Sequence, residues 1–346
     1  MNHELHQGAG TKLQTQEGEF LYFGGTSYLG LQYHTEFQEK IISGIRKWGT
    51  NFGASRKANI KLSVFQEFEN LIAHRLQAEE AICVSSGYLA GQMLTQYFSI
   101  QQIPQFCAPH THPALIGKDS VKTENFQDLE SKMVKNGNRK CVLFLDSIDF
   151  DGNNFPDFTW LFKLDLKNVI LVVDDSHGLG LLGDDGFGLP DFLQKFSPGE
   201  LIICASLGKA LATPCGIIAA NTERIEALRN FSFYGGGSPP SPAALQGFMQ
   251  AEILCREQLQ ILRKNIDQFQ KEVVSDFQAI SMPQYPVFTY DDEALTRYLY
   301  SEKIITTNFH YPLPDSPLLS KIVLSAAHTS QEIRKLTDAI NSFYCS

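Results

Sequence analysis

Short apolar runs alternate with longer amphipathic stretches through the middle of the chain. Residues 62–77 and 89–98 carry apolar side chains at helical spacing, which predicts two helices. The buried stripe of the first helix consists of Val64, Phe65, Phe68, Leu71, Ile72 and Leu76. Five runs too short for helices predict strands, and these are residues 81–84, 141–145, 169–173, 201–205 and 215–220. We expect the last four to be inner strands of a mostly parallel sheet that helices cover on both faces.

The pattern changes after the prolines at 239, 240 and 242. Residues 243–274 predict one long helix, and residues 321–324 predict a strand. Thr329 and Glu332 form the sequence signature of a capping box at the start of a last helix. We therefore expect an N-terminal segment at 1–35, a large domain at 36–240 and a small α+β domain at 241–346.

Composition limits the classes of partner. The 346 residues are 43% hydrophobic, enough for a substantial core. The net charge of -9 argues against nucleic acid and against an anionic membrane. No stretch approaches the roughly 18 apolar residues of a membrane span, and the first residues lack a signal-peptide core. Seven scattered cysteines indicate reduced thiols. These features predict a cytoplasmic protein.

Polar residues directly follow two of the predicted inner strands. Asp174 ends the run at 169–173, with His177 three residues later, and Lys209 follows the run at 201–205. The carboxyl ends of parallel strands line the ligand crevice of such sheets. A carboxylate there can hold the pyridinium N–H of pyridoxal 5'-phosphate (PLP), and a desolvated lysine can form a Schiff base with its aldehyde.

Two further segments provide groups that suit a phosphorylated aromatic cofactor. The turn Ser85-Ser86-Gly87-Tyr88 precedes a helix, so its backbone N–H groups can bind a phosphate, and Ser206 can add a hydroxyl. Tyr88 or another ring can flank the cofactor. Either histidine of Pro109-His110-Thr111-His112-Pro113 can lie flat against its ring.

Three competing motifs do not fit. The glycines at 178, 180 and 183 match the dinucleotide-binding spacing, but acidic residues surround them and no helix follows. Gly208-Lys209 is no P-loop, because Ile203 stands where the first glycine belongs and Ala210 where Ser or Thr would bind magnesium. Cys107, His110 and His112 have no fourth ligand at zinc spacing, so we expect no metal.

Together these residues give the chain a resemblance to the α-oxoamine synthases, which are fold-type I PLP enzymes. The matching motifs are Tyr28-Leu29-Gly30-Leu31, Gly53-Ala54-Ser55-Arg56, Ser86-Gly87-Tyr88, His112 after Pro109, Asp174-Asp175-Ser176-His177-Gly178-Leu179-Gly180, Ser206-Leu207-Gly208-Lys209, Ser238-Pro239-Pro240 and Ser325-Ala326-Ala327-His328-Thr329. The resemblance implies an α/β, aspartate aminotransferase-like fold with a large, mostly parallel, seven-stranded sheet and a smaller α+β domain.

The resemblance also implies roles for individual residues. Lys209 would carry PLP and move the Cα proton, and Asp174 would pair with the pyridine nitrogen. His177 would contact the phenolic oxygen, and His112 would stack on the ring and assist as a proton donor. The phosphate would be held by Ser206 and the turn Ser86, Gly87 and Tyr88. Gly236 and Gly237 lie in a stretch that approaches the partner's phosphate in the family, which implies a homodimer with shared active sites.

Departures from the family pattern concern the substrate. Lys321 stands where the family has a carboxylate-binding arginine, and a lysine lacks the bidentate fork. Thr26-Ser27 replaces the usual asparagine before the Tyr-Leu-Gly-Leu motif, and Asp146-Ser147-Ile148-Asp149 aligns ambiguously with a glutamate-containing strand end. We assign Lys321, Thr26 and Ser55 to substrate binding.

Three functions stay open at this point. The first is decarboxylative condensation of an amino acid with an acyl thioester of the acyl-CoA type. The second is transamination on the same scaffold, which the changes at Lys321 and Thr26 favour. The third, a PLP-binding subunit without turnover, is disfavoured because Lys209, Asp174 and His112 are all present.

Overall fold

The computed structural model of the protein describes residues 3–311 and 313–345. Its contacts divide into two compact units. The first, which we call the sheet unit, comprises Thr35–Asp149 and Asn153–Glu252. The second unit takes the described residues of 1–34, 150–152 and 253–346. The chain thus passes between the units after Glu252, while the domain limits at 35 and 240 stay predictions.

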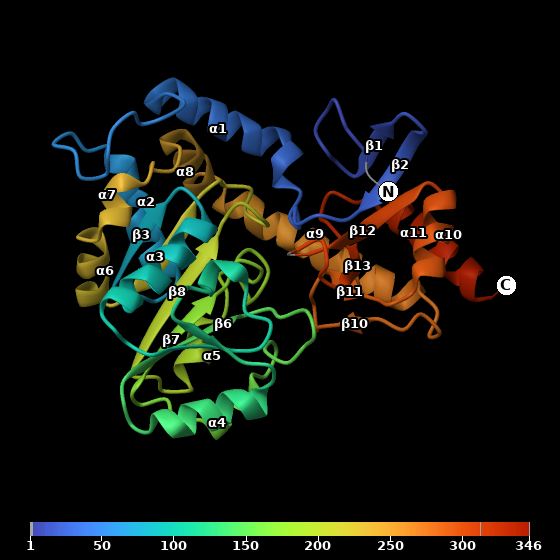
Figure 1. The fold of residues 1–346 in the computed structure, drawn as a ribbon. Helices are drawn as coiled ribbons and strands as arrows, with labels where there is room; N and C mark the ends of the chain where they lie inside the picture. The colour runs from blue at the N-terminus through green and yellow to red at the C-terminus, as the bar shows by residue number, and fades with distance from the viewer. Residues whose placement is uncertain (1–2, 312, 346) are drawn as a thin grey trace. The chain divides into compact units, whose positions relative to one another are not determined.

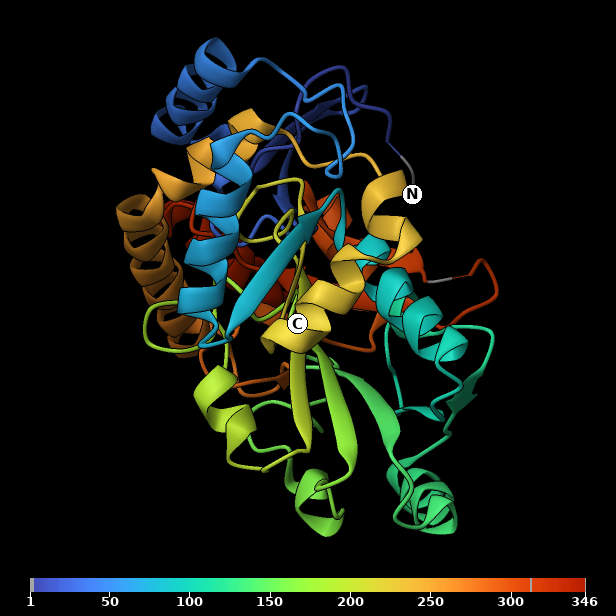
Figure 2. The same cartoon turned by 90° about the vertical axis from the view of Figure 1, so that its left-hand side faces the viewer.

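A seven-stranded sheet forms the centre of the sheet unit (Figures 1 and 2). In spatial order its strands are β3 (Glu80–Val84), β9 (Gly216–Ala220), β8 (Glu200–Ser206), β7 (Val169–Asp174), β6 (Cys141–Asp146), β4 (Gln105–Cys107) and β5 (Ser120–Lys122). Strand β9 runs in the opposite direction to the other six strands of this sheet, which all run the same way. The predicted mostly parallel sheet is therefore confirmed, and the four runs expected to be inner are β6 to β9.

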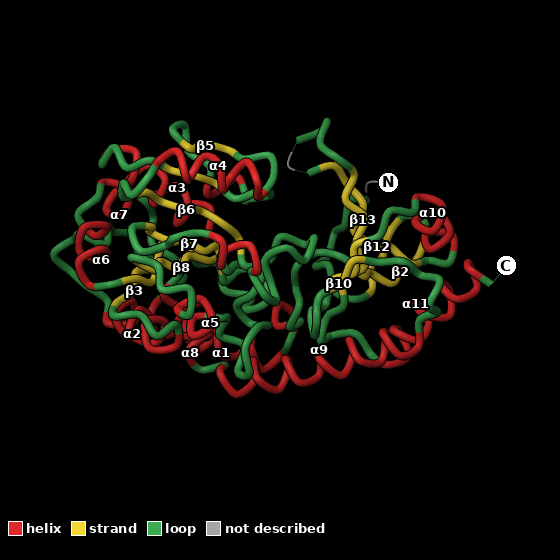
Figure 3. Tube along the Cα trace, turned by 90° about the horizontal axis from the view of Figure 1, so that it is seen from below, coloured by secondary structure: helices red, strands yellow, loops and turns green. Residues whose placement is uncertain are grey.

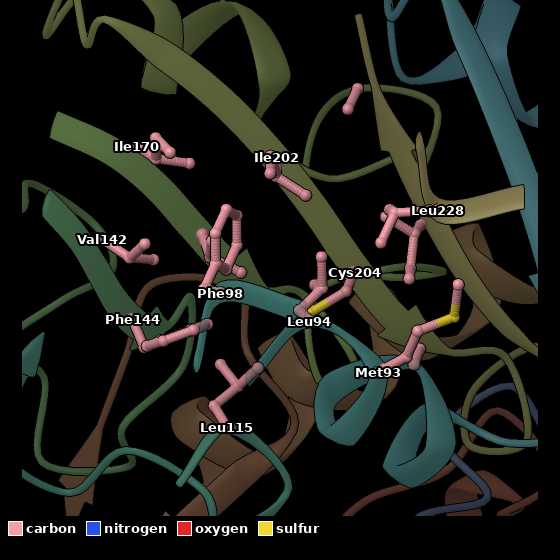
Figure 4. Close-up of a cluster of buried hydrophobic side chains, with 14 of the residues drawn as sticks. Met93, Leu94, Phe98, Leu115, Val142, Phe144, Ile170, Ile202, Cys204 and Leu228 are labelled. Atoms are coloured by element: carbon pink, nitrogen blue, oxygen red, sulfur yellow. The ribbon is translucent and has the colours of Figure 1, made fainter. Parts of the chain in front are cut away.

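The two faces of this sheet are buried by different side chains of the same strands. On β6, Val142 and Phe144 belong to one hydrophobic cluster, while Leu143 and Leu145 belong to the other. Figure 4 shows the first cluster, in which helix α3 (Gly87–Ile100) presents Met93, Leu94 and Phe98 to the strands. Both faces of the sheet are buried, which is why the strand sequences are continuous apolar runs and do not alternate between apolar and polar residues.

Helices surround the sheet. Besides α3 they are α1 (Thr35–Trp48), α2 (Ser63–Arg75), α4 (Phe126–Asn136), α5 (Pro190–Gln194), α6 (Thr222–Arg229), α7 (Ser232–Gly236) and α8 (Pro242–Met249), with short 3-10 turns at Leu31–Tyr33, Pro113–Leu115 and Thr159–Lys163. The predicted helices at 62–77 and 89–98 are confirmed as α2 and α3. The prediction of one helix at 243–274 is wrong, because α8 ends at Met249 and α9 (Glu252–Glu272) follows. Neither Gln250 nor Ala251 is a helix breaker, so the interruption has no signal in local propensity.

A six-stranded sheet organises the second unit. Its order is β1 (Lys12–Thr15), β2 (Gly18–Phe23), β12 (Ile304–His310), β13 (Leu318–Val323), β11 (Val287–Thr289) and β10 (Ile280–Ser281). Helices α10 (Glu293–Ser301) and α11 (Ser330–Tyr344) lie together beside it (Figure 3). The strand predicted at 321–324 is β13. The predicted capping box of α11 is confirmed, because the amide of Glu332 donates to Thr329 Oγ1 and the amide of Thr329 donates to Glu332 Oε2.

Two properties of the described residues bear on the compositional predictions. None of their helices combines the length and apolarity that crossing a bilayer requires. All seven cysteines are free thiols; Cys345 is exposed, and the others are buried.

Candidate functional site

The ends of β6, β7 and β8 bring polar side chains to one edge of the central sheet. Asp146 ends β6 and lies opposite Asp174, the last residue of β7, in the parallel register. Ser206 ends β8, and Lys209 follows it in the next turn. Strand β3 points the same way as β8, because both pair antiparallel with β9 between them. The turn at Ser86 therefore emerges at this edge as well.

Asp174 is a buried carboxylate held by its own turn. The amide of Ser176 donates to Asp174 Oδ1 at 2.8 Å, and Ser176 Oγ accepts from the amide of Ser206 at 2.7 Å. These two bonds tie the end of β7 to the end of β8. Only 6% of Asp174 is exposed, so this side chain lies in a low-dielectric environment.

Lys209 lies within electrostatic reach of the two strand-end carboxylates. Burial lowers the pKa of its amine, and Asp174 and Asp146 act in the opposite direction. The backbone around it is fixed by bonds from the amide of Thr213 to the carbonyl of Leu207 at 3.0 Å and from the amide of Ala212 to the carbonyl of Lys209 at 3.2 Å. A desolvated lysine amine with a lowered pKa is more readily neutral, and the neutral amine is the nucleophile.

Of the two candidate histidines, His112 joins this group. Its backbone amide donates to Asp146 Oδ2 at 2.7 Å, and its ring Nδ1 accepts from the amide of Ala114 at 3.1 Å. That acceptor role assigns the proton of the neutral ring to Nε2. Burial lowers the pKa of His112, with Asp174 raising it and Lys209 lowering it. His110, by contrast, is exposed and has a left-handed backbone at φ 62.

Asp146 was not singled out by the sequence, yet it is central to the geometry. Burial and the neighbouring Asp174 raise the pKa of its carboxyl well above the usual range, although the bond from the His112 amide lowers it. The signal available in the sequence was its position directly after the apolar run 141–145. The sequence did not single out Asp146 because either Asp146 or Asp149 can be aligned with the glutamate of the family's strand end.

A second buried carboxylate lies beside Asp174. The hydroxyl of Ser147 donates to Asp175 Oδ1, and burial raises the pKa of Asp175 to about 7. Asp175 therefore changes its charge close to neutral pH.

The turn after β3 approaches Ser206 so closely that only glycine fits. A Cβ on Gly87 would lie 2.6 Å from Ser206 Cβ and 2.8 Å from its backbone nitrogen. Ser86 caps α3 by accepting from the amide of Leu89 at 3.1 Å. The amides of Gly87 and Tyr88 lie in the first helical turn, where N–H groups have no partner within the helix. Side-chain hydroxyls, backbone N–H groups and a helix N-terminus thus form a cradle that suits a phosphate.

The remaining predicted cofactor residues lie in the same unit. His177 is half-buried in the turn that follows Asp174, and the side chain of Tyr88 is 59% exposed. Ser55 Oγ donates to the carbonyl of Gly235 at 2.7 Å, which ties the Gly53–Arg56 motif to the glycines at 235–237. Gly236 is exposed at the end of α7, and the amide of Gly237 closes that helix by donating to the carbonyl of Phe233 at 2.8 Å.

The predicted substrate residues Lys321 and Thr26 belong to the second unit. Lys321 lies on β13 with 9% of its surface exposed, and its Nζ is 3.3 Å from the ring centroid of Phe150. Burial lowers the pKa of Lys321 to about 8, and Asp151 acts to raise it. Thr26 is exposed and follows Gly25, whose amide donates at 3.3 Å to Thr307, the register partner of Lys321. Thr26 is thus next in sequence to a residue that contacts β12, the strand that pairs with β13 at Lys321. Phe150 had no signal in the sequence.

No cluster of three or more potential metal-binding side chains occurs among residues 3–311 and 313–345. The groups at the strand ends are instead an amine, an imidazole, hydroxyls and carboxylates. This set defines an α/β enzyme that can hold an aromatic phosphate ester and move protons beside it.

The chain belongs to the aminotransferase class I and II family, which matches residues 125–340. It is 26% identical to the 8-amino-7-oxononanoate synthase of Petrotoga mobilis, over 93% of this chain and 89% of that protein. It is 25% identical to the serine palmitoyltransferase of Bacteroides ovatus, over 97% of this chain and 91% of that protein.

A solved structure shares the fold. The serine palmitoyltransferase of S. paucimobilis, solved as a variant with a PLP–myriocin aldimine bound, superposes with a TM-score of 0.82 at 15% identity. The match covers 99% of this chain and 92% of that one. Together these matches confirm the predicted resemblance to the α-oxoamine synthases and the predicted fold class.

Proposed function

We propose that the chain is a PLP-dependent acyltransferase that condenses an amino acid with an acyl thioester. The new bond joins the amino acid's Cα to the acyl carbonyl carbon, the carboxyl group leaves as CO2, and the thiol is released. The observation that carries this proposal is the convergence of Lys209, Asp174 and His112 at one sheet edge in a chain whose relatives are named as such synthases. The predictions of an enzyme and of PLP as its cofactor are confirmed at the level of the family.

The described residues fit PLP. The glycine-lined cradle at Gly87 and Ser206 suits its phosphate, and we assign Ser86 and Tyr88 to the same cradle. When bound, PLP supplies an electron sink that stabilises negative charge on the substrate's Cα, provided that its ring nitrogen is protonated. We assign Asp174 to hold that proton as a buried carboxylate, and His177 to contact the phenolic oxygen.

The chain's own side chains then handle the protons. The lowered pKa of Lys209 favours its neutral amine, which could take a proton from Cα of an amino acid bound beside it. His112 can stack on the ring and donate a hydrogen bond from Nε2–H to the acyl oxygen, because its Nδ1 accepts from the amide of Ala114. Asp146 positions His112 by accepting from its backbone amide.

Substrate recognition falls to residues outside this proton-handling group. Lys321 is a buried cation suited to the amino acid's carboxylate, and Thr26 lies near its strand. Ser55 is assigned to the substrate as well, at the point where its hydroxyl meets Gly235. In a homodimer, Gly236 and Gly237 of one copy would approach the phosphate bound by the other. We propose that dimer, and a cytoplasmic location that the buried free thiols support.

The test is a substrate panel on the PLP-loaded protein. Glycine, alanine and serine are each combined with acyl-CoA donors of increasing chain length, and free thiol and CO2 are measured. Equal release of both supports condensation. Pyridoxamine phosphate that accumulates with amino acid alone would replace the proposal with transamination, which the lysine at 321 motivates. A protein that runs as a monomer under native conditions would remove the shared-site proposal.

A further inference from the structure

The ammonium of Lys321 packs against a cluster of aromatic side chains within the second unit. Phe150 lies directly against its ammonium, with Nζ 3.3 Å from the ring centroid. The Phe150 ring meets Tyr285 edge-on at 6.4 Å, and Tyr285 in turn packs against Tyr28 at 6.2 Å. Tyr28 and Tyr285 are almost fully buried and share a side-chain hydrogen bond. Phe150 is therefore held in place against the ammonium by its packing on these two buried tyrosines.

Phe150 is held in an unusual backbone conformation. Its φ is 63°, in the left-handed region that residues other than glycine rarely adopt, and Gly152 follows with φ 75°. The loop is closed at its base by the amide of Asn153, which donates to both carboxylate oxygens of Asp149 at 3.3 and 3.1 Å. Backbone strain of this kind is kept where the surrounding structure needs a side chain in one place, and it gathers at ligand sites.

The other described groups around Lys321 compensate its positive charge only weakly. Its register partners are Thr289 on β11 and Thr307 on β12, which are uncharged. Among the described residues, Asp151 is the carboxylate that acts on its pKa, and that effect is smaller than the effect of burial. A buried ammonium on an aromatic face, with hydroxyl-bearing neighbours, is suited to an anionic ligand group.

We propose that Phe150 is a positioning residue for the Lys321 ammonium, which its ring holds in place to receive the carboxylate of the amino-acid substrate. This inference rests on the proposed function, because that function supplies the amino acid. A lysine has a flexible stem and a single point charge, so it lacks the planar fork by which an arginine orients a carboxylate. The ring of Phe150 supplies the missing orientation. The residue thereby governs affinity for the amino acid and leaves the chemical step unchanged.

A pH dependence follows from the lysine. Since its pKa is about 8, the ammonium loses its charge as pH rises through that value, and the carboxylate loses its partner. Affinity for the amino acid should therefore fall above about pH 8. Lys321→Arg keeps its charge at all these pH values and should abolish this fall. Asp151→Asn removes the group that raises the pKa, so the fall should begin at lower pH.

The experiment measures equilibrium binding of glycine, alanine and serine to the PLP-loaded protein by the change in its visible spectrum, together with kcat and KM where turnover occurs. Phe150→Leu removes the aromatic face and keeps an apolar side chain. We expect amino-acid affinity to fall about 10-fold with kcat within about twofold of wild type. Phe162→Leu is the matched control, because that ring belongs to the sheet unit, is exposed and packs against Phe196. This control should match wild type.

A double-mutant cycle separates positioning from general damage. Lys321→Met removes the ammonium, and adding Phe150→Leu to it should cost no further affinity if Phe150 acts through Lys321. Equal losses from Phe150→Leu in both backgrounds, or unchanged affinity in the single variant, would overturn the inference. Thermal midpoints of every variant check folding. If wild type binds no amino acid at all, the proposed function fails instead; if it binds one without condensing it, the inference is still tested.

Discussion

Replacing Gly87 by alanine tests the cradle assigned to the cofactor's phosphate. The added Cβ would lie 2.6, 2.8 and 2.9 Å from the Cβ, N and Cα of Ser206, so either the start of α3 or the end of β8 must move. Overpacking of this kind costs about 1–3 kcal/mol, of which the helix propensity of alanine returns less than about 1 kcal/mol. If the movement opens the cradle, about 1–3 kcal/mol corresponds to a loss of about 5-fold to 150-fold in PLP affinity.

The assay is titration of the cofactor-free protein with PLP, followed by its visible absorbance, with thermal midpoints recorded with and without PLP. Gly10→Ala is the matched control, because nothing lies within 4 Å of the Cβ it would add. We expect weaker PLP binding and a smaller stabilisation by PLP for Gly87→Ala alone. Wild-type PLP affinity combined with an unchanged midpoint would show that Ser206 and Gly87 do not form the cradle.

Two further changes probe charge and capping. Asp175→Asn fixes the neutral state of a carboxyl whose pKa is raised to about 7. Because the folded value exceeds the unfolded one of about 3.9, the stability that Asp175 contributes is complete below about pH 4 and is lost as pH rises through about 7, by at most about 4 kcal/mol. Denaturant unfolding at several pH values should therefore show wild type losing stability relative to the variant across this window, and parallel curves would refute the assignment. Thr329→Ala removes the capping box of α11 and should lower unfolding free energy by about 1 kcal/mol with unchanged activity; unchanged stability would count against the cap.

Much of the central sheet could be predicted because both of its faces are buried. The strands at 141–146, 169–174 and 200–206 are continuous apolar runs apart from polar residues at their ends, so their positions and their carboxyl ends could be predicted. Asp174 and Lys209 followed from those ends, since parallel strands finish at the same edge. The capping box of α11 was equally local.

What escaped prediction depends on contacts between distant parts of the chain. Strand β2 pairs with β12, more than 280 residues away, and nothing in either segment indicates the other. The break between α8 and α9 coincides with the passage from one unit to the other, and no glycine or proline marks it. Phe150 follows Asp149 in a polar loop, and only its contact with Lys321 gives it a role. Such roles arise from tertiary placement, which a single sequence does not encode locally.

The central claim is that Lys209 carries PLP through a covalent C=N bond. Borohydride reduction of the PLP-loaded protein converts that bond into a stable amine, and peptide mass spectrometry then locates it. We expect one phosphopyridoxyl group on the peptide that contains Lys209, and none at that position in Lys209→Ala. A label on a different lysine of the wild type, or a wild type that takes up no PLP, would contradict the account.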